Sequence, residues 1–82
     1  MLKFEELELD SKGELVEVMR VTGSDIVMVD YPVQGVKLLV ETARSCEETE
    51  STDGFDVKIV DGQGDIWFVK GKVKANDKTK ST

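Results

Sequence analysis

Carboxylate side chains are concentrated between Cys46 and Val57, where no basic residue interrupts them. The segment contains Glu47, Glu48, Glu50, Asp53 and Asp56. Together with the hydroxyls of Thr49, Ser51 and Thr52, they offer the oxygen ligands of hard cations such as Ca²⁺, which takes about six to eight of them. The spacing is not that of an EF-hand loop, so weak binding is expected. The segment therefore predicts a divalent-cation site, with Ca²⁺ as the cofactor, at these five acidic residues.

Two other interpretations of this acidity stay open. The segment from Glu47 to Gly54 has no apolar residue, and its charges could serve only to keep a solvated loop soluble. An acidic face could instead dock a basic protein, because complementary charge steers association. A non-enzymatic interaction module with a basic protein partner is therefore the alternative functional hypothesis.

Charge is divided unevenly along the chain, whose formal net charge is −6. Most acids precede residue 70, whereas the end of the chain carries Lys70, Lys72, Lys74, Lys78 and Lys80. These lysines could neutralise the acids of the first predicted hairpin, which are Glu5, Glu6, Glu8, Asp10, Glu14 and Glu17. The negative total argues against nucleic acid as a partner, since affinity for phosphate comes chiefly from Lys and Arg.

The residue types argue against an enzyme. The chain has no histidine, the most common general base. Its single cysteine, Cys46, precedes Glu47 and Glu48, which disfavour a thiolate, so it is expected to be an apolar core residue. Asp61-Gly62-Gln63-Gly64-Asp65 superficially suggests a calcium loop, but two aspartates cannot complete a calcium shell. It is interpreted as a hairpin turn.

The length of 82 residues predicts one small domain, assigned to residues 1–75, followed by a disordered basic tail at 76–82. No apolar run approaches the roughly 20 residues of a membrane span, and Met1 to Glu5 does not open a signal peptide. A cytoplasmic location without a membrane partner is the expectation. The chain has many charged residues and few carboxamides, a composition that resembles that of thermophile proteins.

Hydrophobic patterns predict the elements. Residues 2–9 and 14–21 are expected to form a hairpin around Asp10 to Gly13, although Ser11 to Glu14 also fits a helix capping box. The apolar run 26–29 predicts a central strand covered on both faces and ended by Pro32.

The second half of the chain adds a helix and a hairpin. The apolar spacing over 33–46 predicts a helix, with a hairpin turn at Gln34-Gly35 as the alternative. Residues 55–59 and 66–73 predict a final hairpin in which Trp67 and Val69 share one face. The expected fold is α+β: a small antiparallel sheet of two hairpins plus a central strand, with one helix packed on a face.

The whole chain resembles the small acidic hypothetical proteins of methanogenic archaea. The resemblance rests on overall length and character and on the segment Glu47-Glu48-Thr49-Glu50-Ser51-Thr52-Asp53-Gly54. It implies an α+β fold with calcium-binding character and agrees with the thermophile composition. It assigns no ligand residues.

Overall fold

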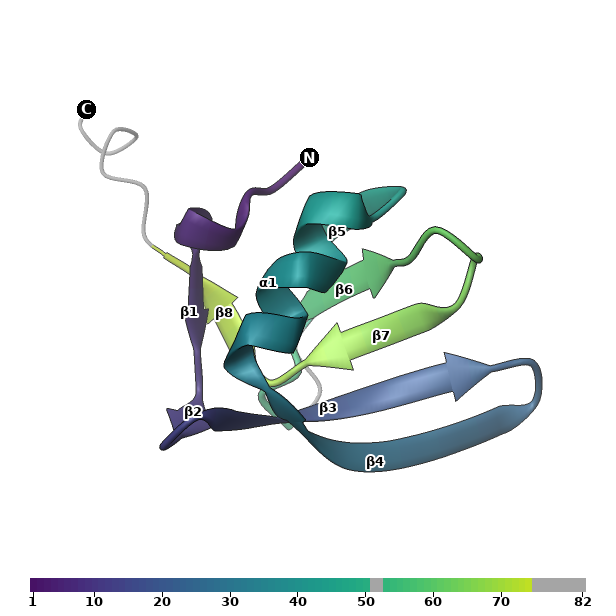
Figure 1. Cartoon of the computed structure of the whole chain (residues 1–82), viewed down its shortest axis with the longest axis horizontal. Helices are drawn as coiled ribbons and strands as arrows, with labels where there is room; N and C mark the ends of the chain where they lie inside the picture. The colour runs from purple at the N-terminus through teal and green to yellow at the C-terminus, as the bar shows by residue number, and fades with distance from the viewer. Residues whose placement is uncertain (51–52, 75–82) are drawn as a thin grey trace.

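The computed structural model describes residues 1–50 and 53–74, and the predicted tail at 76–82 lies outside these ranges. The described chain forms a curled antiparallel sheet with one α-helix against one face, so the predicted α+β class is confirmed (Figure 1). The elements are the 3₁₀ turn η1 (Phe4–Glu6), β1 (Leu7–Leu9), β2 (Ser11–Lys12), β3 (Leu15–Thr22), β4 (Asp25–Pro32), α1 (Val33–Thr42), β5 (Ser45–Glu48), β6 (Val57–Val60), β7 (Ile66–Val69) and β8 (Gly71–Val73).

The sheet curls where two stretches of chain bend side by side: β1 leads into β2, and β7 leads into β8. Strands β5, β6, β7, β3 and β4 are successive neighbours, β2 pairs with the start of β3, and β1 pairs with β8. Only Asp10 separates β1 from β2, and only Lys70 separates β7 from β8. At this bend the Asp10 N–H donates to the Lys70 carbonyl at 2.9 Å. A Cβ on Gly71 would lie 2.7 Å from the Glu8 carbonyl oxygen, so this crossing requires glycine.

The core lies between the sheet and α1. Side chains of a strand alternate between its two faces, so every second residue faces the helix. The buried cluster comprises Leu7, Val16, Val18, Val36, Val40, Cys46, Val57, Ile59, Trp67 and Val69. Only Val36 and Val40 of these come from α1, which therefore closes a core that is built mainly by the strands.

Helix α1 begins at Val33 as predicted, but it ends at Thr42 and not at residue 46. The chain turns because the Arg44 N–H donates to the Val60 carbonyl at 2.7 Å and starts β5. Cys46 is buried as expected, but it lies opposite Ile59 in β5, so its placement on the helix was wrong. Gly35 is helical, and the hairpin alternative is excluded. A Cβ there would lie 2.7 Å from a ring carbon of Tyr31, so the glycine makes room for that ring.

Strand β4 is not the central strand that the apolar run predicted. It pairs only with β3 and lies at the edge of the sheet. Its four apolar residues are exposed, with Ile26 at 64%, Val27 at 52%, Met28 at 51% and Val29 at 38%. Figure 1 shows the β3–β4 hairpin extending beyond α1, so the helix does not cover the tip of this hairpin.

The first predicted hairpin also differs in its partners. Residues 7–9 pair with β8, and only Ser11 and Lys12 pair with β3, opposite Val16 and Leu15. The turn is Gly13-Glu14, with Gly13 at φ +63°. The long partner of β3 is β4, joined by a turn in which Gly23 has φ +59°. A positive-φ glycine at the first central position is typical of a type II′ hairpin.

The final hairpin, β6 to β7, is confirmed. Trp67 and Val69 face the core, as their spacing predicted. Within the described part of the chain, no helix combines the length and the apolar character that crossing a membrane requires.

Candidate functional site

The structure divides the predicted cation ligands between strand β5 and the connection that leads from β5 to β6. Glu47 and Glu48 belong to β5 and not to a loop, so successive side chains point to opposite faces. Glu47 lies directly opposite Lys58 of β6, which offers the charge compensation that the sequence did not reveal. Glu50 and Asp53 are exposed, Asp53 with φ 55° in a turn, and Asp56 precedes β6.

These carboxylates do not converge on one point. Over residues 1–50 and 53–74, no group of three or more His, Cys, Asp or Glu side chains has the arrangement of a metal site. Thr49 donates its N–H to the Asp56 carbonyl at 2.8 Å, which extends the β5–β6 pairing. Divalent-cation binding at Glu47, Glu48, Glu50, Asp53 and Asp56 stays a prediction.

Asp56 has a distinctive environment. It lines a hollow of about 350 Å³ together with Glu8, Leu9, Asp10, Gly54, Gly71 and Lys72. Its Oδ1 atom is buried and accepts no hydrogen bond from any described residue. Glu8 lies opposite Lys72 across β1 and β8, so the hollow combines acidic groups with one cation.

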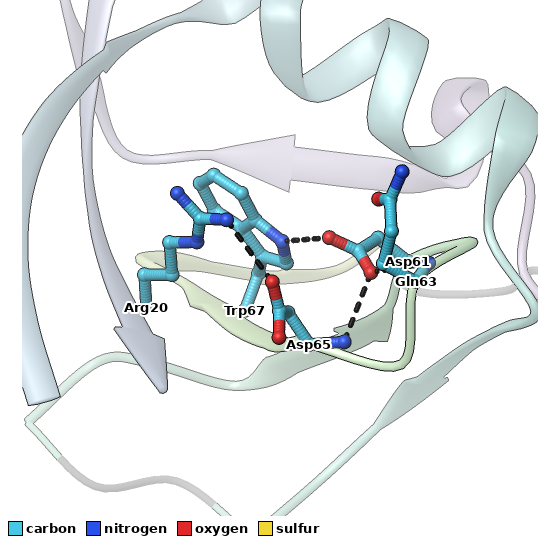
Figure 2. A network of polar contacts seen from close by, with 5 residues as sticks. All are labelled: Arg20, Asp61, Gln63, Asp65 and Trp67. Carbon is cyan, nitrogen blue, oxygen red and sulfur yellow. Dashed lines mark hydrogen bonds and ion pairs between the residues drawn. The ribbon is translucent and has the colours of Figure 1, made fainter. Parts of the chain in front are cut away.

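The most ordered polar network surrounds Asp61, at the β6–β7 turn (Figure 2). Asp61 is only 6% exposed. Its Oδ2 accepts the indole N–H of Trp67 at 2.9 Å, and its Oδ1 accepts the backbone N–H groups of Gln63 and Asp65, each at 2.9 Å. The Arg20 guanidinium lies 4.8 Å from the Trp67 ring centre and pairs with Asp65 at 3.0 Å.

This network fixes the hairpin and its tryptophan. The hydrogen bond from Trp67 lowers the pKa of Asp61, assisted by the Asp65 and Gln63 amides and the charge of Arg20, while burial acts in the opposite direction. All the hydrogen bonds of this carboxylate stabilise the turn. The interpretation of Asp61 to Asp65 as a turn, and not as a calcium loop, fits this geometry.

Cys46 is fully buried, and burial raises the pKa of its thiol. A protonated, inaccessible thiol is a poor nucleophile. This residue therefore serves the core.

A different surface emerges on the sheet face turned away from α1, which we call the outer face. Two rows of directly opposed residues cross it. One consists of Met28, Met19, Phe68, Lys58 and Glu47, and the other of Ile26, Val21, Ile66, Val60 and Ser45. The apolar members Met19, Val21, Val60, Ile66 and Phe68 are half-buried and do not belong to the core cluster, while Ile26 and Met28 are exposed. The outer face is thus apolar over β4, β3 and β7.

An acidic pair borders this apolar area. Glu17 of β3 lies directly opposite Asp30 of β4, an arrangement in which like charges repel. Lys70 approaches Glu17 at 3.4 Å, but neither ion pair found among the described residues involves Asp30. A hollow of about 200 Å³ lies here, lined by Asp10, Lys12, Leu15, Glu17, Asp30 and Lys70.

Part of this surface was visible in the sequence. The alternation that puts Trp67 and Val69 on one face of the final hairpin also puts Ile66 and Phe68 on the other. Met19 alternates with the buried Val18, which also indicates an outer position. Nothing local showed that β3 would lie between β4 and β7 and so unite these side chains.

Comparison with known proteins returned no matching family model, no matching curated protein and no matching solved structure.

Proposed function

We propose that this protein is a non-enzymatic interaction module that binds a basic protein partner through its outer face. The observation that supports the proposal is the apolar area over β4, β3 and β7, bordered by the acidic pair Glu17–Asp30. Apolar patches rimmed by polar residues are typical of protein-binding surfaces. The charge of the rim then selects the partner.

The two parts of the surface have separate roles. Met19, Met28 and Phe68 offer apolar contact area, and methionine adapts its shape to different partners. A lysine or arginine of the partner that lies beside Asp30 would relieve the repulsion between Asp30 and Glu17. The partner is therefore expected to present basic side chains next to apolar ones. Its association rate should fall as salt rises.

A peptide titration tests this proposal. The probe is a synthetic peptide in which lysine alternates with leucine, followed by amide NMR, and the control peptide carries glutamate in place of lysine. The amide signals of Met19, Met28, Asp30 and Phe68 are expected to shift with the lysine peptide and not with the glutamate peptide.

Charge-neutral variants locate the site. The double variant Glu17→Gln with Asp30→Asn should bind the lysine peptide about tenfold more weakly, a loss of about 1.4 kcal/mol. The matched control is Glu5→Gln with Glu41→Gln, which removes two exposed acids elsewhere and should bind like the parent protein. Equal losses in both double variants would show a non-specific charge effect and reject the outer face as the site.

Weak Ca²⁺ binding is a second candidate function, favoured by the buried Oδ1 of Asp56, which has no hydrogen-bond partner among the described residues. Affinities of about 10⁻⁴–10⁻³ M occur in proteins that bind Ca²⁺ loosely. Ca²⁺ at tenfold excess over Kd should stabilise the fold by about 1.4 kcal/mol. Ca²⁺ should shift the amide signals of 47–50 and 53–56 more than Mg²⁺ does, and Asp56→Asn should abolish the shifts. An unchanged spectrum at about 10 mM Ca²⁺ would remove this candidate.

A further inference from the structure

The backbone of β4 presents unpaired hydrogen-bonding groups along one edge. The N–H of Lys70 donates to the Glu17 carbonyl at 3.0 Å, so the backbone groups of Glu17 point away from β4. In an antiparallel pair, the residue opposite then also points its N–H and C=O away from its neighbour. Asp30, opposite Glu17, therefore directs both groups to the free edge, and the alternation repeats at Met28 and Ile26.

Nothing among the described residues satisfies these groups. Strand β4 pairs with β3 alone, and the backbone hydrogen bonds formed outside strands and helices include none from Ile26, Met28 or Asp30. Unpaired backbone groups on an edge strand are a template for another strand. Strand β4 can therefore accept a further strand along its free edge at Ile26, Met28 and Asp30.

The opposite edge of the sheet is protected. Strand β5 has four residues, two of them the exposed acids Glu47 and Glu48. The Leu2 N–H donates to the Cys46 carbonyl at 2.9 Å and covers part of this edge. In β4 the middle of the strand is apolar and exposed on both faces, without any basic residue or proline before Pro32. The contrast singles out β4 as the edge open to pairing.

We infer that β4 pairs with β4 of a second copy of this chain, antiparallel and around a two-fold axis at Met28. Only Ile26, Met28 and Asp30 direct both an N–H and a C=O outward, because Pro32, the next residue in the alternation, has no N–H. Each of the three must therefore face one of the same three residues in the second copy. The register that uses all three places Met28 opposite Met28, and Ile26 opposite Asp30 in both directions. It allows about six new backbone hydrogen bonds, two for each such pair.

Side chains are compatible with this register on both faces. Val27 lies opposite Val29, which continues the apolar character of the core-side face. On the outer face, the row Phe68–Met19–Met28 continues directly into its symmetry equivalent. Asp25 lies opposite Tyr31 and Asp30 opposite Ile26, so no carboxylate faces another across the interface. A register that opposed Asp25 and Asp30 would require inward-pointing backbone groups, and the geometry excludes it.

This inference is independent of the proposed function. Pairing uses the edge of β4, whereas the proposed partner binds side chains of the outer face. The two-fold axis leaves both outer faces on the same side of one continuous sheet. Self-pairing would therefore join the two apolar areas into one, with a Glu17–Asp30 pair on each side of the central methionine row.

Two lysine substitutions test the register. Met28→Lys would place two lysines directly opposite each other and should raise the dimer Kd about tenfold or more. Ile26→Lys would place each lysine opposite an Asp30, and the dimer should be retained or tightened. Sedimentation equilibrium over a range of protein concentrations measures both, with circular dichroism to verify folding. A parent protein that stays monomeric at about 1 mM, or equal weakening by both variants, would overturn the proposal.

Hydrogen exchange distinguishes strand pairing from association through the outer face. On dimerisation, the amides of Ile26, Met28 and Asp30 should become protected, whereas face-to-face packing would leave them unprotected. Met28→Pro removes an outward N–H that β3 does not use, a position where an edge strand tolerates proline. It should give a folded monomer. A dimer whose three edge amides still exchange rapidly, or one that survives Met28→Pro, would contradict the inference.

Discussion

At the scale of single residues, two aspartates show how differently the fold treats the same side chain. Asp61 is buried, and hydrogen bonds reach both of its oxygens. Asp56 has a buried oxygen with no such partner among the described residues. A buried acceptor without a donor is unfavourable. Asp61 thus stabilises the fold, whereas Asp56 has the unused capacity to bind a ligand.

Replacement of Asp61 should destabilise the protein strongly. In Asp61→Asn, the amide cannot accept both the Trp67 indole N–H and the two backbone N–H groups, so at least one buried donor loses its partner. The expected loss in free energy of unfolding is about 2–3 kcal/mol. The control is Asp65→Asn, which removes only the charge from the partly exposed pair with Arg20 and should lose about 0–1 kcal/mol. Urea denaturation measures both, and equal losses would contradict the assigned role of Asp61.

Asp61 should also make stability depend on pH. Its pKa in the folded protein is lowered, chiefly by the hydrogen bond from Trp67. A carboxyl with a lowered folded pKa stabilises the fold above its unfolded pKa, about 3.9, and loses this contribution as pH falls through the folded value. The difference in stability between the parent protein and Asp61→Asn should therefore shrink below about pH 4. Denaturation at neutral and acidic pH measures it, and a constant difference would show that Asp61 does not titrate as proposed.

At the scale of elements, sequence patterns predicted the features that depend on neighbouring residues in the chain. The start of α1 at Val33 follows from Pro32 and the apolar spacing, and the β6–β7 hairpin follows from its alternation and glycine-rich turn. The neighbours of each strand depend on the rest of the fold. The run from Ile26 to Val29 has the composition of a buried central strand, yet it forms backbone hydrogen bonds with a neighbouring strand, β3, along only one of its edges. No pattern within the run distinguishes these two environments.

The helix prediction failed at its end for a related reason. Cys46 continues the apolar spacing of α1 and also suits a core-facing strand position. The structure uses the second option, because pairing with β6 places it against Ile59. The acidic loop is shorter than predicted for the same reason, since Glu47 and Glu48 belong to β5. Placement of the site residues thus depended on a strand boundary, which sequence patterns determine poorly.

The crossing of β1 and β8 should not tolerate a side chain at residue 71. In Gly71→Ala, the added Cβ would lie 2.7 Å from the Glu8 carbonyl oxygen and 2.9 Å from the Leu9 Cα, both of them backbone atoms. The strands must separate, at a cost of about 1–3 kcal/mol. The matched control is Gly62→Ala, whose nearest neighbour would lie 3.9 Å away, with an expected change within about 0.5 kcal/mol. Similar melting temperatures for the two variants would show that β1 and β8 approach less closely than described.

At the scale of the whole molecule, charge is neutralised between distant segments. Lys70 pairs with Glu17 at 3.4 Å, and Lys72 lies opposite Glu8 in the register of β1 and β8. The sequence had predicted that lysines of the last strand could neutralise acids near the start of the chain. The ion pair between Lys70 and Glu17 confirms this for one lysine, whereas Lys72 is a cross-strand neighbour of Glu8 and forms no ion pair with it among the described residues. The acidic segment at 47–56 is less negative in its surroundings than the sequence suggested, because Lys58 lies opposite Glu47. Asp30 lies opposite another acid, Glu17, and the sequence did not reveal this pairing.

Self-pairing at β4 should make thermal stability depend on protein concentration. A dimer that forms only in the folded state is stabilised by mass action, so its melting temperature rises with concentration. A tenfold increase adds about 0.7 kcal/mol per chain where the dimer predominates, which is about 3–5 °C for a domain of this size. Met28→Pro, which should be a folded monomer, is the control and should melt at a constant temperature. Calorimetry over a hundredfold range of concentration measures the effect. A parent protein with a constant melting temperature would show that the edge of β4 stays unpaired. A melting temperature of Met28→Pro that rises with concentration would place the dimer contact elsewhere on the molecule.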